Sequence, residues 1–160
     1  MIQAIDPTEL TVFITGATSG FGAATARRFI EAGSRVVITG RRKERLEALV
    51  NELGERAHAL ALDVRDKAAV NAAVDGLPAP FDRVNVLINI AGLALGLEAA
   101  PEAKMSDWET MVATNINGLL YCTRALLPRM CAADQGHVIN LSSVAGSYPY
   151  PGGNVYGATK

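Results

Sequence analysis

The fold of this chain is decided by the stretch Thr15-Gly16-Ala17-Thr18-Ser19-Gly20-Phe21-Gly22, in which the glycines have the spacing GxxxGxG. The apolar, β-branched run at residues 11–15 predicts a buried strand, and residues 20–32 have the periodicity of a helix. Glycines at such a junction let the backbone turn tightly and approach a phosphate, while the helix N-terminus offers free N–H groups. The sequence therefore predicts a nucleotide-binding loop between a first strand and a first helix.

The rest of the chain continues this alternation of strands and helices. Apolar runs at residues 35–39, 57–62, 84–90 and 137–141 predict further strands, and periodic segments at 43–53, 67–74 and 106–131 predict helices. Asn117-Gly118 is a turn signal, but the periodicity around it favours one long helix. Such alternation is typical of βαβ units. We expect one α/β domain over residues 1–160, with a Rossmann-type doubly wound parallel sheet covered on both faces.

Composition excludes several classes of protein. The chain has 160 residues, 49% of them hydrophobic, and a formal net charge of -1, whereas a sequence-independent nucleic-acid binder needs a basic excess. The longest apolar stretch, residues 84–97, is shorter than the ~18–20 residues of a membrane span. Cys122 and Cys131 match no metal-binding spacing, and the two histidines form no metal pair. We expect a cytoplasmic protein with no metal and with neither nucleic acid nor membrane as a partner.

The residues after the second predicted strand indicate the type of cofactor. An NAD-binding domain of this type carries an acidic residue there, bonded to the ribose 2′-hydroxyl. This chain has Thr39-Gly40-Arg41-Arg42 instead. Gly40 cannot repel a 2′-phosphate, and Arg41 and Arg42 offer planar donors that suit one. The alternative is that the arginines form only the solvated start of a helix. The missing acid together with the added basic residues favours NADP(H).

Further motifs, in order along the whole chain, resemble those of the short-chain dehydrogenase/reductase family. After GxxxGxG come Asp63-Val64, then Asn89-Ile90-Ala91-Gly92, which is similar to the family's NNAG, and then an NxxG motif, a Ser-Ser pair and YxxxK. Ile90 replaces the family's second Asn, so that residue's side-chain hydrogen bond is not expected. The resemblance implies cofactor contacts from Gly16, Ala17, Thr18, Ser19, Gly20, Phe21, Gly22, Arg41, Arg42, Asp63, Val64, Asn89, Ile90, Ala91, Gly92, Tyr156 and Lys160.

The same resemblance implies a catalytic set of Asn115, Ser143, Tyr156 and Lys160. Tyr156 and Lys160 are four residues apart, so we expect their side chains to share one helix face. A nearby ammonium favours the ionised form of a tyrosine, which can then act as a general acid or base. Ser143 would bind the substrate oxygen, with Ser142 as the alternative. Asn115 would hold a helix kink and a water molecule linked to Lys160.

Within the family, segments 92–96, 107–111 and 150–156 resemble bacterial NADP-dependent 3-hydroxy acid dehydrogenases, which oxidise serine and allo-threonine. This implies hydride transfer between nicotinamide and a small 3-hydroxy acid or its 3-oxo form, by a homo-oligomer, a tetramer in the family. The alternatives are a reductase of another carbonyl substrate and a cofactor-binding fragment without turnover. A sugar-nucleotide epimerase shares YxxxK but usually carries GxxGxxG.

The length of family members leads to two further expectations. Because family members are longer, we expect residues 1–160 to lack the C-terminal strands of the family fold, and we expect the natural protein to continue past Lys160. A buried substrate carboxylate needs a cationic or N–H partner, yet residues 142–154 and 92–101 contain no Lys or Arg. We expect this partner to be the backbone of Gly152 and Gly153 or, preferably, the missing segment.

Overall fold

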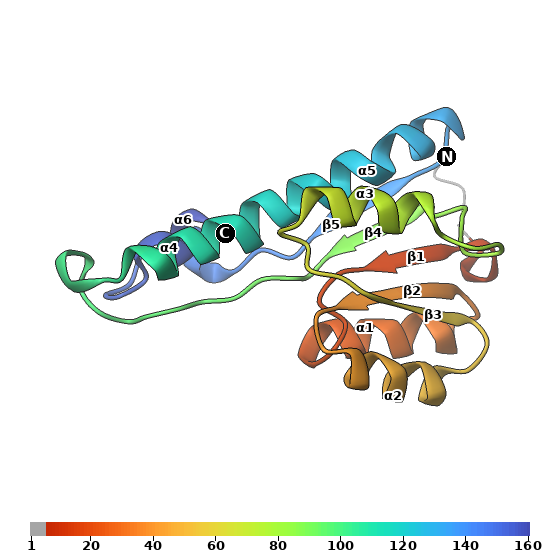
Figure 1. The fold of residues 1–160 in the computed structure, drawn as a ribbon, viewed down its shortest axis with the longest axis horizontal. Coiled ribbons are helices and arrows are strands. Elements are labelled where there is room, and N and C mark those ends of the chain that lie inside the picture. Colours follow the sequence, from red (N-terminus) through yellow and green to blue (C-terminus); the bar gives the residue numbers. More distant parts are fainter. Residues whose placement is uncertain (1–5) are drawn as a thin grey trace.

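The computed structural model describes residues 6–160, and its centre is one parallel sheet (Figure 1). The five strands are β1 (Thr11–Ile14), β2 (Arg35–Gly40), β3 (Ala57–Ala61), β4 (Val86–Asn89) and β5 (His137–Asn140), in the order β3-β2-β1-β4-β5. In this register Phe13 of β1 lies between Val37 of β2 and Leu87 of β4. The doubly wound Rossmann-type sheet predicted from the sequence is confirmed, and its strand order reverses between β1 and β4.

Helices cover both faces of the sheet. α1 (Gly20–Glu31) and α2 (Lys43–Leu53) lie on one face, and α3 (Lys67–Asp75) and α5 (Gly118–Ala132) lie on the other (Figure 1). The shorter elements are η1 (Pro7–Glu9), η2 (Ala100–Glu102), α4 (Met105–Met111), η3 (Val112–Asn117), η4 (Val144–Gly146) and α6 (Asn154–Ala158). At the start of α3, the Asp66 carboxylate accepts a hydrogen bond from the Ala69 N–H at 3.0 Å, as an N-cap does.

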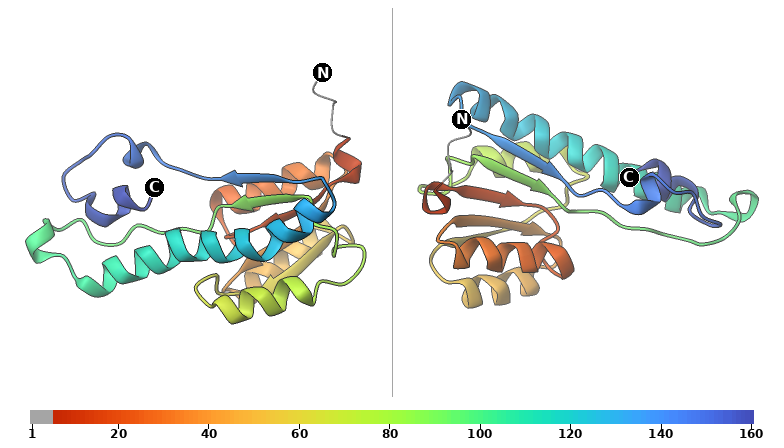
Figure 2. Two further views of the ribbon diagram at one scale, coloured as in Figure 1. Left: turned by 90° about the horizontal axis from the view of Figure 1, so that it is seen from above. Right: turned by 180° about the vertical axis from the view of Figure 1, so that it is seen from behind.

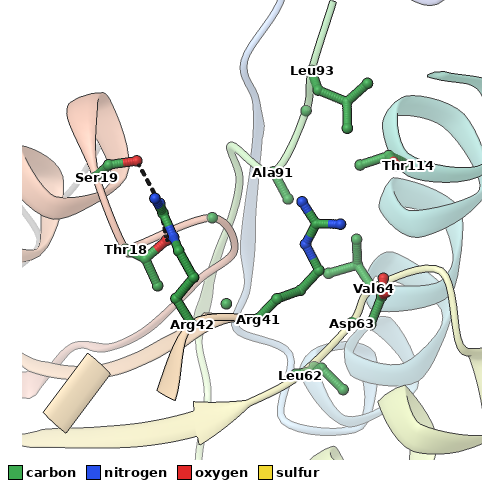
Figure 3. A pocket seen from close by; sticks show the side chains of 13 residues that line it. Thr18, Ser19, Arg41, Arg42, Leu62, Asp63, Val64, Ala91, Leu93 and Thr114 are labelled. Carbon is green, nitrogen blue, oxygen red and sulfur yellow. Dashed lines mark hydrogen bonds between the residues drawn. The ribbon is translucent and has the colours of Figure 1, made fainter. Parts of the chain in front are cut away.

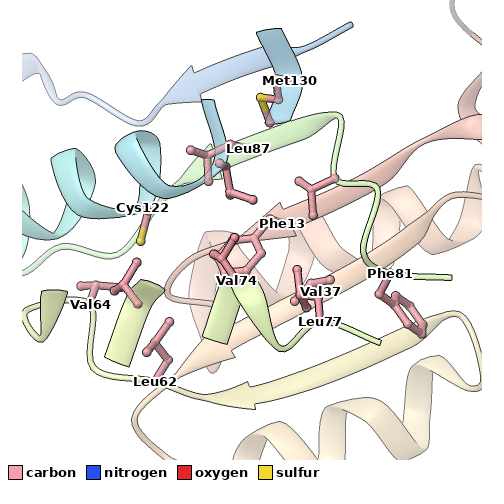
Figure 4. Packing of buried hydrophobic residues seen from close by; sticks show 13 residues of the cluster. Phe13, Val37, Leu62, Val64, Val74, Leu77, Phe81, Leu87, Cys122 and Met130 are labelled. Carbon is pink, nitrogen blue, oxygen red and sulfur yellow. The ribbon is translucent and has the colours of Figure 1, made fainter. Parts of the chain in front are cut away.

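Alternating side chains of the strands build two apolar cores. Phe13, Val37 and Leu87 point to the face of α3 and α5, where they pack in one cluster with Val74 and Met130 (Figure 4). Their neighbours along β1 and β2 form a second cluster with α1 and α2; these neighbours are Val12, Ile14, Val36 and Ile38. Because β1, β2 and β4 are buried on both faces, their sequences are almost continuously apolar.

Replacing Leu87 by Ala should lower the free energy of unfolding by about 2–5 kcal/mol, because the substitution leaves a cavity in this core. The Leu87 side chain is 0% exposed between β1 and the helices of the α3 face. Leu97→Ala is the matched control, because Leu97 is 78% exposed and its truncation should cost no more than about 0.5 kcal/mol. Urea denaturation of both variants measures the difference, and equal losses would contradict the assigned core.

The long helical segment differs from its prediction in one turn. The sequence predicts one helix over residues 106–131, and the structure is helical without a break from α4 to α5 (Figure 2), but η3 between them is π-helical. A π-helix bonds five residues back, which inserts an extra residue into the turn and changes the direction of the side chains there. The prediction that Asn117-Gly118 stays helical is confirmed. A Cβ on Gly118 would lie 2.6 Å from the Val64 side chain, so glycine allows this helix to pack closely.

β5 forms one edge of the sheet, next to β4. Three of its four residues are exposed, including Ile139, and its outer side is unpaired within the described part of the chain. β5 therefore leaves an exposed edge of the sheet among the described residues. Among residues 6–160, no helix is both long and apolar enough to span a bilayer.

Candidate active site

The reversal of strand order places a crevice at the carboxyl ends of β1 and β4, because the segments that leave these strands run to opposite faces of the sheet. A cleft of about 570 Å³ opens there (Figure 3). It is lined by Gly16, Thr18, Ser19, Gly40, Arg41, Arg42, Leu62, Asp63, Val64, Ala91, Gly92, Leu93 and Thr114. A second cavity of about 430 Å³ shares Gly16, Ser19, Ala91, Gly92 and Leu93 with the cleft and extends to Tyr156 and Lys160. The two cavities therefore adjoin.

The glycine-rich loop is held against the segment that follows β4. Gly16 has φ 70°, which favours glycine, and a Cβ there would lie 2.8 Å from Ala91 Cα. A Cβ on Gly22 would overlap the Gly16 carbonyl oxygen. Thr15 Oγ1 accepts hydrogen bonds from the N–H groups of Ile90 and Ala91, both at 3.0 Å. Sequence reasoning missed Thr15 as a site-forming residue; the one signal was a hydroxyl at the end of a buried strand.

Arg41 and Arg42 reach different parts of the cleft. The Arg42 guanidinium donates to Thr18 Oγ1 at 2.6 Å and to Ser19 Oγ at 2.9 Å, while Arg41 extends toward Ala91 and Val64 (Figure 3). The planar donors and the two hydroxyls form a pocket that suits a phosphate. A Cβ on Gly40 would lie 2.5 Å from Thr18 Cγ2, so an acidic residue at this position would collide with the loop.

Asp63 faces the other side of the same cleft. Its carboxylate accepts hydrogen bonds from Arg65 Nη2 at 2.6 Å and from Arg65 Nε at 3.0 Å. This guanidinium holds the pKa of the Asp63 carboxyl below its usual range, and the charge of Arg41 acts in the same direction. Asp63 is therefore a fixed anion in the cleft. Sequence reasoning missed Arg65, because no motif or pattern in the sequence around it indicates that it contacts Asp63.

The residues after β4 divide into structural and cleft-lining groups. The Asn89 side chain is buried and donates to Thr123 Oγ1 at 3.1 Å and to Asn140 Oδ1 at 2.9 Å, so it joins β4 to α5 and β5. Ile90 packs against the apolar cluster beneath α1 and also lines the second cavity. Of the predicted cofactor-binding residues, four line neither cavity: Ala17, Gly20, Gly22 and Asn89. Of these four, Asn89 acts through its side-chain hydrogen bonds, and Gly22 allows close packing against Gly16.

The second cavity gathers Ser143, Tyr156 and Lys160, three of the four predicted catalytic residues. Ser142 also lines it, but its hydroxyl donates to the Lys160 carbonyl oxygen at 2.7 Å. Ser143 Oγ accepts the Ala145 N–H at 3.2 Å, which leaves its own hydrogen available to a ligand. The Lys160 ammonium donates to the Leu141 carbonyl oxygen at 3.1 Å. The hydrogen bonds therefore favour Ser143 over Ser142 as the residue that faces a ligand.

Asn115, the fourth predicted catalytic residue, lies behind this cavity on η3. Its side chain is 5% exposed and makes hydrogen bonds to both the N–H and the carbonyl of Leu93, each at 2.9 Å. A Cβ on Gly92 would lie 3.1 Å from Lys160 Nζ and 3.3 Å from Asn115 Oδ1. Gly92 therefore lies close to both the lysine ammonium and the Asn115 amide, and a larger residue there would press against them.

That Tyr156 and Lys160 share one helix face stays a prediction, because Tyr156 lies on α6 and Lys160 is the last residue of the sequence. α6 ends at Ala158, and Thr159 is its C-cap. The Lys160 N–H bonds to the Gly157 carbonyl three residues back, a tighter turn than that of an α-helix. Both side chains line the second cavity, and the Lys160 ammonium donates to the carbonyl of Leu141, which follows β5.

The remaining polar groups form no second centre of this kind. Within residues 6–160, no group of three or more His, Cys, Asp or Glu side chains is placed to hold a metal ion. Burial raises the pKa of the Cys122 thiol to about 12, so this thiol stays protonated at neutral pH. The arrangement thus combines a cationic cleft, suited to a phosphorylated ligand, with an adjoining cavity that presents hydroxyl groups and an ammonium.

Comparison with known proteins gives consistent matches over almost the whole chain. The sequence pattern of the family described as short chain dehydrogenase matches residues 10–160. An NADP-dependent 3-hydroxy acid dehydrogenase from Salmonella typhi is 56% identical over 151 residues, which cover 94% of this chain and 61% of that protein. A serine 3-dehydrogenase from Agrobacterium fabrum is 56% identical over 150 residues, covering 94% of this chain and 60% of that protein.

Solved structures match equally well. The closed form of a serine dehydrogenase complexed with NADP⁺ has a TM-score of 0.93 and 53% identity, covering 94% of this chain and 61% of that chain. Serine dehydrogenase from Escherichia coli has a TM-score of 0.92 at 53% identity, covering 94% of this chain and 69% of that one. This chain therefore spans about three fifths of the length of the curated relatives that it matches, 61% of the first of them.

Proposed function

The chain belongs to the short-chain dehydrogenase family, and on that basis we propose that it carries the NADP(H)-binding and catalytic part, residues 1–160, of an oxidoreductase for small 3-hydroxy acids. The observation that carries the proposal is that Ser143, Tyr156 and Lys160 meet in one cavity, which adjoins the cleft lined by Arg41 and Arg42. The relatives named for NADP and for serine support the choice of cofactor and substrate.

The residues of the cleft fit NADP(H). Gly16 and Gly22 allow the loop to pack tightly against Ala91 and against itself, so that a pyrophosphate could approach the loop backbone, and the N-terminus of α1 adds N–H groups. Arg41 and Arg42, with the hydroxyls of Thr18 and Ser19, would hold the 2′-phosphate. Asp63 and Val64 would flank the adenine, and Ala91 and Gly92 the ribose. The nicotinamide, when bound, supplies the acceptor or donor of the hydride.

In the proposed reaction Tyr156 transfers the proton. When the alcohol is oxidised, its hydroxyl proton passes to the Tyr156 oxygen as the hydride leaves the substrate carbon, and reduction reverses both transfers. Ser143 donates a hydrogen bond to the substrate oxygen, where negative charge develops. The Lys160 ammonium places a positive charge in the same cavity, and Asn115 keeps the segment around Gly92 and Leu93 in place.

The proposed substrate carries a carboxylate, whose partner we place outside residues 6–160. Lys160 is the one basic residue lining the second cavity, and the mechanism uses its charge. The Gly153 N–H, which the sequence left as a candidate, donates to the Tyr150 carbonyl at 3.0 Å. Tyr150 and Gly153 line a separate cavity of about 250 Å³. The curated relatives are longer than this chain, and their remaining length offers room for such a partner.

A substrate panel tests the proposed substrate class. With the full-length protein and NADP⁺, kcat/KM for 3-hydroxypropionate should exceed that for 1-propanol by at least about tenfold, because a hydrogen bond to a charged group contributes about 1.5–3 kcal/mol. The values of kcat/KM for serine and allo-threonine should likewise exceed the value for 1-propanol. Faster turnover of the uncharged alcohol, or of secondary alcohols, would replace the hydroxy-acid assignment with a reductase of another carbonyl substrate. Absence of any turnover would favour a module that only binds the cofactor.

We also propose that the protein acts in the cytoplasm as a homo-oligomer, a tetramer by family resemblance. The long helical segment formed by α4, η3 and α5 (Figure 1) carries three exposed apolar residues, Val112, Leu120 and Leu127. They are 37%, 54% and 41% exposed and are separated by eight and seven residues. Such apolar exposure along one helix supports association. The two cysteines are unpaired, which suits a reducing compartment.

A further inference from the structure

We infer that Thr159 is a positioning residue for the Tyr156 and Lys160 pair, an inference that rests on the proposed function. Thr159 lies between these two residues in the chain and has no role in the motifs recognised from the sequence. Its hydroxyl makes two hydrogen bonds. It accepts one from Asn115 Nδ2 at 2.9 Å and donates one to the Tyr156 carbonyl oxygen at 2.8 Å. The hydroxyl therefore connects η3 to the segment that carries both catalytic side chains.

The Asn115 amide depends on this contact. Its Oδ1 accepts the Leu93 N–H, and its two amide hydrogens go to the Leu93 carbonyl and to Thr159 Oγ1. Both donors of the amide are thus used, in a side chain that is 5% exposed. Removing the Thr159 hydroxyl would leave a donor without a partner among these groups, and a buried donor without a partner is destabilising. The amide would rotate, and its bonds to Leu93 would weaken.

The affected contacts surround the catalytic cavity. Leu93 lines both cavities, and a Cβ on Gly92 would lie close to both Asn115 Oδ1 and the lysine ammonium. On the other side of Thr159, the substitution also removes the side-chain bond to the Tyr156 carbonyl, one of the contacts that hold the turn carrying Tyr156 and Lys160. Thr159 touches neither cavity itself, so its influence passes through Asn115 and through this turn.

Three variants of the full-length protein test this role. Thr159→Val keeps the branched shape and removes the hydroxyl, and Thr159→Ser keeps the hydroxyl. Thr11→Val is the matched control, because Thr11 is 0% exposed at the start of β1 and its hydroxyl accepts a bond from Arg35 Nε at 3.2 Å. Thr11 is the first residue of β1, whereas the glycine-rich loop follows the last residue of this strand, so Thr11 lies away from the site.

We expect Thr159→Val to lower kcat with 3-hydroxypropionate by about tenfold or more, since small displacements of catalytic groups reduce rates steeply. KM and the Kd of NADPH should change less than about threefold, and Thr159→Ser should recover at least half of the wild-type kcat. Rescue by Ser assigns the loss to the hydroxyl, because Ser lacks the methyl group that Thr and Val share. A wild-type kcat in Thr159→Val, or an equal loss in Thr11→Val, would overturn the inference.

Amide hydrogen exchange measured by NMR, without cofactor or substrate, gives an independent readout. In Thr159→Val the Leu93 amide should exchange between about two- and tenfold faster, the effect of weakening one hydrogen bond. Thr159→Ser and Thr11→Val should leave this rate unchanged. An unchanged Leu93 rate in Thr159→Val refutes the inference whatever the enzyme does. A wild-type protein that turns over no hydroxy acid refutes the proposed function instead, so the two failures are distinguishable.

Discussion

Replacing Tyr156 by Phe should lower kcat by at least ~10²-fold while NADPH still binds, because the substitution removes the proposed general acid and base and leaves the ring. Among the residues lining the second cavity, Tyr156 carries the single phenolic hydroxyl. The hydroxyl of Ser143 cannot replace it, because a serine gains and loses protons far less readily near neutral pH. Measurement of kcat, together with fluorescence titration of NADPH, separates loss of chemistry from loss of binding.

Tyr121→Phe is the matched control for this variant. Tyr121 lies on α5 and packs, partly buried, against the core of the α3 face, so its phenol is lost far from the catalytic set. Its kcat should stay within about twofold of the wild-type value, as expected of a substitution outside the site. If Tyr156→Phe kept a comparable kcat, the assignment of Tyr156 as the proton-transferring residue would be wrong.

Changing Arg41 to Asp and Arg42 to Ala together should move cofactor preference from NADPH toward NADH. Each hydrogen bond to a charged group contributes about 1.5–3 kcal/mol, so losing two should lower kcat/KM for NADPH at least about tenfold. The Asp at position 41 would also repel a 2′-phosphate. Arg42 is held by Thr18 and Ser19, so its removal takes away a donor that is already oriented toward the loop.

Arg45→Ala provides the control for loss of a nearby positive charge outside the cleft. Arg45 is exposed on α2, close in sequence to the pair but not part of the cleft lining. The ratio of kcat/KM for NADPH and NADH should be unaffected in this variant. A double variant with the wild-type ratio would show that the 2′-phosphate is held by other residues than Arg41 and Arg42.

The sequence alone determined the architecture and the chemistry of the main cleft. Strands such as Val12–Ile14 of β1 and Val36–Ile38 of β2 are recognisable because burial on both faces requires continuous apolar residues. The glycine loop and the missing acid at Gly40 are likewise local patterns, since they depend on the backbone and charge of neighbouring residues. Both features follow from interactions that span only a few positions of the chain.

The tertiary structure decided which residues hold the site together. Thr15 bonds to Ala91 across 76 positions of the sequence, and Asn115 bonds to Thr159 across 44. The π-helical turn at η3, which periodicity did not predict, belongs to the same group, because Asn115 on this turn bonds to both Leu93 and Thr159. Hydrogen bonds between distant residues exist only once the sheet and helices have packed, and no local pattern of residue types encodes which hydroxyl will meet which amide.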